Sequence, residues 1–250
     1  ASGGEDVGSV TETECRHREG YGAEKNAYAV VHKLSFCSNA DLQIPNQRKN
    51  GYLYAMKNIV FDLGGVLFAR DKNKSTQEFH EFFSFIRSER MPLFWEEYDR
   101  GASTLGEVTD ILARTTGCPR EKCERFLLLS IDMQEPVAPT ERLVGDLKAA
   151  GYRLYVLSNM SREFIAFLRR FPVYRLFDGE VVSCEEGTVK PEPRIYEILL
   201  ERYGLDPAET LFIDDRAANI AAAEGLGIAG YLFDHRNPAA ACDELRRRLL

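Results

Sequence analysis

The amino-acid sequence predicts an α/β protein built on a parallel β-sheet, with a helical segment inserted early in the chain. From residue 140 onward, short apolar runs alternate with amphipathic helical stretches, which is typical of a parallel sheet covered by helices on both faces. A further apolar run at 59–61 precedes this region. Between the two, the periodicity is helical, so we expect a helical insert that ends near Pro136 and Pro139.

The composition is that of an ordinary globular protein. Of the 250 residues, 44% are hydrophobic and 28% are charged, and no apolar run approaches the length needed to span a bilayer. A net charge of −7, with scattered lysines and arginines, argues against a nucleic-acid partner. The six cysteines lack the spacing of a disulfide framework or a zinc site. We therefore expect a cytoplasmic protein without membrane or nucleic-acid partners, and nothing indicates its oligomeric state.

Residues 1–55 are predicted to form an extension outside the fold. They are rich in polar residues and glycine, and they show neither sustained helical nor strand periodicity. They also lack the charged start and long apolar middle of a secretory signal. Met56 lies immediately before the first convincing strand.

The predicted elements follow in order along the chain. Amphipathic helical patterns in the insert cover 79–86, 93–98, 105–112 and 123–131. After the insert, we expect strands at 153–157, 181–182, 211–213 and 229–233. The helices between them are expected at 140–150, around 164–168, from Lys190 through Leu199, around 219–220 and at the C-terminus.

Polar side chains stand where these strands end. Asp62 follows the first strand, Ser158 follows the second, and the pair Asp214 and Asp215 follows 211–213. The carboxyl ends of parallel strands share one edge of the sheet, so we expect these side chains to meet there, with Lys190 close enough to reach them.

The charges of this set indicate a cation and an anion. Three carboxylates in one place repel one another unless a cation lies among them, and hard oxygen ligands suit Mg²⁺. A serine and a lysine then offer donors to a phosphate. Taken singly, each has a simpler explanation: Asp62 as a strand end with a tight turn, Ser158 and Asn159 as a helix cap, and Lys190 as a surface lysine.

Four motifs in order resemble those of the haloacid dehalogenase superfamily. They are FDLGGVL at 61–67, LSN at 157–159, KPEPRIY at 190–196 and FIDDRAANI at 212–220. The resemblance spans residue 56 to the C-terminus and is greatest to the sugar-phosphatase-like members, such as glucose-1-phosphatase-like proteins. It implies a Rossmann-like core over 56–69 and 137–250, with an α-helical cap over 70–136.

The resemblance also implies a Mg²⁺-dependent phosphatase and a role for each motif residue. Asp62 is expected to attack phosphorus and form an aspartyl-phosphate. The implied metal ligands are Asp62, the carbonyl of Gly64, Asp214 and Asp215. Ser158 and the backbone of Asn159 are expected to bind the phosphoryl group, and Lys190 to neutralise it. The substrate is then a small phosphorylated metabolite, with a sugar phosphate as the leading expectation.

One departure from the family pattern bears on catalysis. Most phosphatases of the family have a second aspartate two residues after the nucleophile, and this chain has Gly64 there. A slow enzyme, a substrate with a good leaving group, or an acid supplied by the cap would each account for it. Two other activities stay open: a metal-free dehalogenase, and a catalytically weak member that binds a phosphorylated ligand or a partner. Trp95, Tyr98 and Arg100 are the candidates in the cap for setting specificity, although core packing or solvation is the simpler explanation for Tyr98 or Arg100 taken singly.

Overall fold

The computed structural model describes residues 56–71, 74–87 and 91–250 of the chain. The extension predicted over residues 1–55 lies outside the described residues. Within the described ranges, no helix has both the length and the apolar character that crossing a membrane requires.

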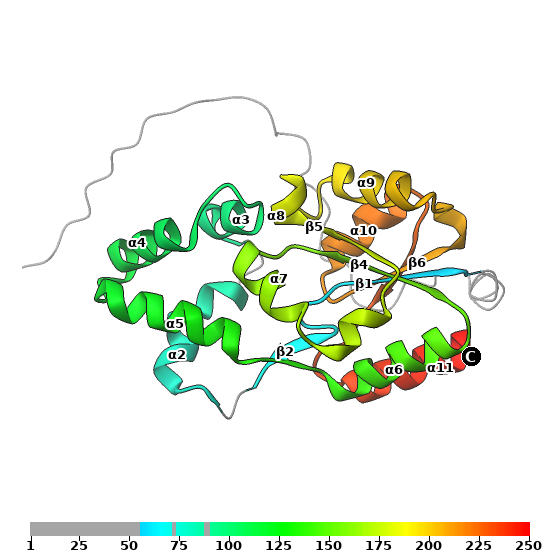
Figure 1. The fold of residues 1–250 in the computed structure, drawn as a ribbon, viewed down its shortest axis with the longest axis horizontal. Coiled ribbons are helices and arrows are strands. Elements are labelled where there is room, and N and C mark those ends of the chain that lie inside the picture. Colours follow the sequence, from blue (N-terminus) through cyan, green and yellow to red (C-terminus); the bar gives the residue numbers. More distant parts are fainter. Residues whose placement is uncertain (1–55, 72–73, 88–90) are drawn as a thin grey trace, which may run out of the picture. The chain divides into compact units, whose positions relative to one another are not determined.

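A five-stranded parallel sheet in the order β5-β4-β1-β6-β7 forms the centre of the fold (Figure 1). Its strands are β1 (Asn58–Phe61), β4 (Arg153–Ser158), β5 (Gly179–Val182), β6 (Thr210–Asp214) and β7 (Ala229–Leu232). Each strand coincides with a predicted apolar run, apart from small shifts at the ends. The predicted α/β fold class with a Rossmann-like core is confirmed.

Helices cover both faces of this sheet (Figure 1). One face carries α6 (Ala138–Ala149), α7 (Arg162–Leu168) and α11 (Pro238–Leu249), and the other carries α9 (Pro193–Tyr203) and α10 (Ala217–Gly225). Shorter turns are η4 (Pro172–Leu176), α8 (Ser183–Glu186) and η5 (Pro207–Glu209). Successive side chains of a strand point to opposite faces, so Ile59 and Phe61 pack in one core and Val60 in the other. All three are fully buried, so β1, like its neighbours β4 and β6, contributes to both cores.

The insert between β1 and α6 packs around an aromatic cluster that also includes Phe164 of α7. The helices of the insert are α2 (Gln77–Phe82), η3 (Ser84–Arg87), α3 (Leu93–Asp99), α4 (Leu105–Thr116) and α5 (Arg120–Asp132). Phe79, Trp95 and Phe126 are among the buried residues that pack together there. Thr104 and Glu107 form a capping box at the start of α4, which satisfies backbone donors that a free helix end would expose.

A two-stranded ribbon links the insert to the sheet and was not predicted. β2 (Phe68–Arg70) pairs antiparallel with β3 (Gln134–Pro136). Strands of three residues are too short to show a period of two, and a proline such as Pro136 argues against a strand although it is tolerated at an edge. The expectation of helices alone is therefore wrong at the two ends of the insert. The domain limits at 70 and 136 stay a prediction.

Four consecutive residues at the C-terminal end of α3 contact the core. The Tyr98 hydroxyl donates to Glu163 at 2.8 Å, the Asp99 carbonyl accepts from Ser183, and Arg100 pairs with Glu192 at 2.6 Å. Gly101 has a φ of 78°, and a Cβ there would lie 2.5 Å from the carbonyl oxygen of Cys184. Only glycine combines this backbone conformation with so close an approach, so the end of α3 has a fixed position against α8.

This close approach predicts that Gly101→Ala destabilises the protein more than Gly117→Ala. The two glycines have φ values of 78° and 70°, a region that costs a residue with a side chain about 1–2 kcal/mol. At Gly117 a Cβ would have no neighbour within 4 Å, whereas at Gly101 it would meet a backbone oxygen. Urea unfolding of both variants measures the difference, and equal losses would show that α3 is not held closely against α8.

Candidate active site

The polar residues predicted at the strand ends lie together at one edge of the sheet. Asp62 follows β1, Ser158 is the last residue of β4, and Asp214 is the last residue of β6. Because β4 and β6 flank β1, their ends surround Asp62. The Ser158 hydroxyl donates to Asp62 Oδ1 at 2.7 Å, so the expected convergence of these side chains is observed.

Lys190 reaches this edge from a turn, where a helix start was predicted. Helix α9 begins only at Pro193, because Lys190 precedes Pro191 and the residue before a proline is disfavoured in a helix. Asn159 fixes the turn: its carbonyl oxygen accepts from the Lys190 N–H at 2.7 Å, and its amide donates to the Lys190 carbonyl at 2.9 Å. Asn159 therefore makes its contacts with the backbone of Lys190.

The Lys190 ammonium is buried between two carboxylates. Its Nζ lies 2.9 Å from Asp62 Oδ1 and 2.6 Å from Asp214 Oδ2, and it also donates to the Leu157 carbonyl at 3.0 Å. The side chain of Lys190 is 1% exposed. A buried ammonium requires such partners, because leaving one charge of the group unpaired costs several kcal/mol, on the order of 3–5. The surface-lysine explanation for Lys190 is therefore wrong.

Asp214 is the most enclosed acid of the group. Its side chain is fully buried. Besides Lys190, it accepts hydrogen bonds from the Asn219 amide at 3.0 and 3.1 Å and from the Arg216 backbone N–H at 2.8 Å. These protein donors occupy both of its oxygens.

The three acids form a site that fits a divalent cation. One carboxylate oxygen from each of Asp62, Asp214 and Asp215 lies within 4.8 Å of the others. Such a cluster of hard oxygen donors matches the preference of Mg²⁺, and a cation would relieve their mutual repulsion. The side chain of Asp215 is 18% exposed, so this acid is open from outside. The expected participation of the Gly64 carbonyl stays a prediction.

The two glycines after Asp62 have different spatial requirements. Gly65 has a φ of 78°, and a Cβ there would lie 2.4 Å from Asp215 Oδ2. The turn can pass beside this acid because Gly65 has no side chain. At Gly64, by contrast, a Cβ would have no atom within 4 Å. The space next to Asp62 on this side is open.

The burial and charges of the site shift the pKa values of its acids and its lysine. Burial raises the pKa of Asp62 to about 6, with Lys190 and the Ser158 hydroxyl lowering it and the charges of Asp214 and Asp215 raising it. Burial and the charge of Asp214 also raise the pKa of Asp215. Burial alone would lower the pKa of Lys190, but Asp214 and Asp62 raise it above its usual value. The lysine therefore stays charged at neutral pH.

The cap residues expected to set specificity have protein partners. Trp95 is 5% exposed in the aromatic core of the insert, and Tyr98 is 1% exposed. The Tyr98 hydroxyl and the Arg100 guanidinium contact Glu163 and Glu192 of the core. Trp95 thus packs within the aromatic cluster, while Tyr98 and Arg100 attach the insert to the core. The amino-acid sequence alone does not distinguish such contacts from contacts with a substrate.

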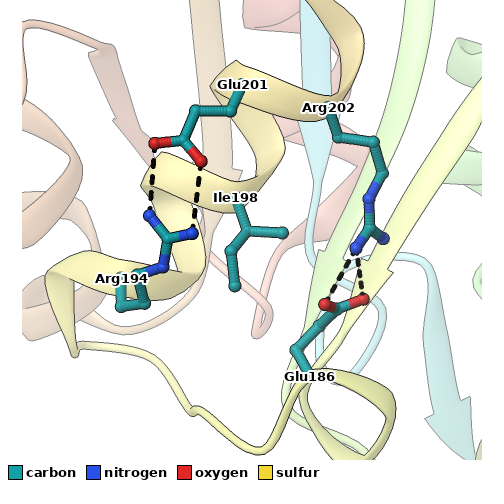
Figure 2. Close-up of a pocket in the computed structure, with 5 residues that line it drawn as sticks. All are labelled: Glu186, Arg194, Ile198, Glu201 and Arg202. Carbon is teal, nitrogen blue, oxygen red and sulfur yellow. Dashed lines mark hydrogen bonds and ion pairs between the residues drawn. The ribbon is translucent and has the colours of Figure 1, made fainter.

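A separate hollow between α8 and α9 does not have the character of an anion site. Figure 2 shows its lining side chains: Glu186, Arg194, Ile198, Glu201 and Arg202. Both arginines are paired, Arg194 with Glu201 at 3.2 Å and Arg202 with Glu186 at 2.7 Å. Their charges are neutralised within the hollow, and no strand-end acid lines it. The candidate site is therefore the group around Asp62.

The chain is similar in sequence to hydrolases of known activity. A family model described as haloacid dehalogenase-like hydrolase matches residues 56–227. The chain is 31% identical over 194 residues to the sesquiterpene phosphatase astK of Aspergillus oryzae, which covers 76% of this chain and 95% of that protein. It is 27% identical to a D-ribitol-5-phosphate phosphatase of Bacteroides thetaiotaomicron, over 69% of this chain and 89% of that one.

Solved structures agree with these sequence matches. A HAD family enzyme of Bacteroides thetaiotaomicron, crystallised with magnesium and inorganic phosphate, superimposes with a TM-score of 0.57 at 26% identity, covering 72% of this chain and 95% of that one. A HAD-like hydrolase from Porphyromonas gingivalis gives a TM-score of 0.60 at 29% identity, with 77% and 98% covered. The protein is a hydrolase with an α/β core. It belongs to the haloacid dehalogenase-like hydrolases, as the four motifs predicted.

The crowding of acids predicts that Asp62→Asn stabilises the metal-free protein. The pKa of Asp62 is about 6 in the fold and 3.8 ordinarily, so ionisation of Asp62 opposes folding as the pH rises through this window. Above pH 6 the variant should gain about 1–3 kcal/mol in the free energy of unfolding, and the gain should vanish as the pH falls toward 4. Urea unfolding in EDTA at several pH values measures this, and a variant less stable throughout would show that the Asp62 charge is needed to hold Lys190.

Proposed function

We propose that the protein is a Mg²⁺-dependent phosphatase that hydrolyses a small phosphorylated metabolite through an aspartyl-phosphate on Asp62. The observation that carries this proposal is the buried Lys190 ammonium, 2.9 Å from Asp62 and 2.6 Å from Asp214. A carboxylate and a phosphate repel each other, and a fixed positive charge beside the carboxylate lowers that repulsion. The acid cluster at the same edge supports a cation as the second source of positive charge.

The hydrogen bonds of Asp62 support different roles for its two carboxylate oxygens. The donors on its Oδ1 are the Ser158 hydroxyl, the Lys190 ammonium and the backbone N–H of Leu63. In the part of the chain that the structure describes, no hydrogen bond is made to Oδ2. We infer that Oδ2 attacks phosphorus while the Oδ1 contacts keep the carboxylate oriented, so that little reorganisation accompanies the reaction.

The remaining residues of the site have positioning or binding roles in this proposal. Asp62 and Asp215 would hold Mg²⁺, which supplies positive charge to the phosphate oxygens. Asp214 would position Lys190, since its oxygens already accept from Lys190 and Asn219. Ser158 and the backbone of Asn159 would bind the phosphoryl group.

A sugar phosphate is the substrate class that we propose to test first. The D-ribitol-5-phosphate phosphatase and a phosphorylated carbohydrates phosphatase of Thermotoga maritima are among the relatives. The sesquiterpene phosphatase is also a relative, at 31% identity, so isoprenyl phosphates belong in the same panel. Comparing kcat/KM for sugar phosphates and for isoprenyl phosphates of increasing chain length distinguishes the two substrate classes.

The two competing activities make different predictions in the same assay. A dehalogenase would release halide from 2-haloacids without a metal, but solved dehalogenases are only 20% identical to this chain and share its fold. The cluster of acids around Asp62 argues against that chemistry, because attack on carbon needs no cation. A catalytically weak member would bind phosphate esters in the presence of Mg²⁺ without turning them over.

Variants of the two metal-cluster acids test the proposal. Asp62→Asn should lose phospho-enzyme formation and nearly all turnover while keeping the fold, because the change is isosteric and removes the nucleophile. Asp215→Asn should instead raise the Mg²⁺ concentration needed for half-maximal rate, so that excess metal restores part of the activity. Steady-state kinetics against Mg²⁺ concentration and trapping with a fluoride–metal phosphate mimic are the measurements.

Asp243→Asn is the matched control, since Asp243 is an exposed acid on α11. It should leave both the rate and the Mg²⁺ dependence unchanged. Wild-type turnover by Asp62→Asn would overturn the assignment of the nucleophile.

A further inference from the structure

Gly64 has no side chain that could protonate a leaving group beside Asp62. A Cβ at Gly64 would have no atom within 4 Å, so no other side chain fills the position. An alkoxide leaving group needs a proton as its bond to phosphorus breaks, and a positioned acid typically contributes about 10²–10⁴-fold to the rate. The acids at the strand ends are occupied by the cation site and by Lys190. A donor from another element is therefore required.

Asp99 at the end of α3 has a side chain without a structural role in the described part of the chain. It is half-buried, and no hydrogen bond or ion pair engages its carboxylate among the described residues. Its backbone is fixed, because the Ser183 hydroxyl donates to its carbonyl. The neighbouring Tyr98 and Arg100 are also bound to the core. The chain thus holds Asp99 in place while its carboxyl stays available.

The backbone contacts of Asp99 place this residue at the same edge of the sheet as the candidate site. The Ser183 hydroxyl that holds its carbonyl also accepts from the Met160 N–H at 2.9 Å, two residues after Ser158. The charges of Asp62 and Lys190 both act on the Asp99 carboxyl. Ser183 directly follows β5 and Met160 comes shortly after β4, so Asp99 lies at the edge of the sheet where these strands end, the edge that also holds Asp62.

We propose that Asp99 is the general acid and base of the reaction, supplied by the cap in place of the side chain that Gly64 lacks. This inference rests on the proposed phosphatase function. In the first step, Asp62 Oδ2 forms a bond to phosphorus, the bond from phosphorus to the leaving oxygen breaks, and the Asp99 carboxyl gives its proton to that oxygen. In the second step, the Asp99 carboxylate takes a proton from water, the water oxygen bonds to phosphorus, and the bond from phosphorus to Asp62 Oδ2 breaks, which frees inorganic phosphate and restores the Asp62 carboxylate.

The electrostatic surroundings of Asp99 suit both steps. Burial raises its pKa to about 7; Arg216 and Lys190 lower it, while Asp62 and Glu96 raise it. A carboxyl with a pKa near the working pH is present in both forms, so it can give a proton and later take one. These four groups come from the ends of β6 and β1, from the turn before α9 and from α3 itself.

The test is Asp99→Asn with two esters that differ in their need for a proton. For an alkyl phosphate, kcat/KM should fall by about 10²–10⁴-fold, because the alkoxide leaves unprotonated. For 2,4-dinitrophenyl phosphate, whose leaving group needs no proton, kcat/KM should stay close to wild type. Hydrolysis of the phospho-enzyme should become slow, so this ester should give a burst of dinitrophenolate. In the wild-type protein, kcat/KM for the alkyl ester should decline above pH 7 as the Asp99 carboxyl loses its proton, and in Asp99→Asn this decline should be absent.

Two further variants make the outcome decisive. Glu97→Gln changes an exposed acid of the same helix and should leave kcat/KM unchanged for both esters. Asp99→Ser lacks the acid as well and repeats the test if Asp99→Asn does not fold. Equal losses for both esters in a folded variant, or no loss for either, would overturn the role of Asp99. Absence of wild-type turnover with both esters would overturn the phosphatase proposal itself.

Discussion

The buried contact of Lys190 with Asp62 and Asp214 is the interaction on which the site depends. Three strands have to end at the same level for it to form, because Asp62 follows β1, Asp214 ends β6, and the Leu157 carbonyl of β4 accepts from the same ammonium. The Phe212 ring, 5.3 Å from Nζ, adds a favourable face for the cation. A single charge therefore links the alignment of the sheet to the reactivity of Asp62.

The turn after β1 shows how the chain makes room around this charge. Gly65 allows the backbone to pass beside Asp215, where any side chain would collide with the carboxylate. Gly64 has no such constraint, so its lack of a side chain has no steric cause in the fold. The open volume beside Asp62 is thus a property of the site, and it shifts the task of proton transfer away from the core.

Much of the core was predictable because its signals are local and repeated. Buried parallel strands appear as short apolar runs, and Asp62 and Asp214 stand out as charges directly after such runs. Lys190 was placed by its motif, but two prolines delay the start of α9, which a helical pattern alone does not reveal. The β2–β3 ribbon is too short to give a periodic signal.

Contacts between distant segments carried no sequence signal. For Arg100 and Tyr98 the sequence leaves substrate contact and core packing both open, since nothing local indicates that Glu192 and Glu163 lie opposite them. Asp99 carries no signal for the same reason, because its neighbours along the chain do not reveal that the core approaches it. A pattern of residues can report a helix and its faces, whereas the partner of an exposed face is fixed by tertiary packing.

The contacts of α3 with the core connect the helical insert to the site at the strand ends. The Arg100 guanidinium holds the pKa of Glu192 at about 2, and Gly101 allows α3 to approach the backbone of Cys184 closely. Asp99 directly precedes Arg100 and Gly101, the two residues that make these contacts. The position of Asp99 against the core is thus determined by contacts of α3 that belong to the fold itself. In this arrangement the core supplies the fixed charges, and the geometry of proton transfer depends on how the cap is attached to it.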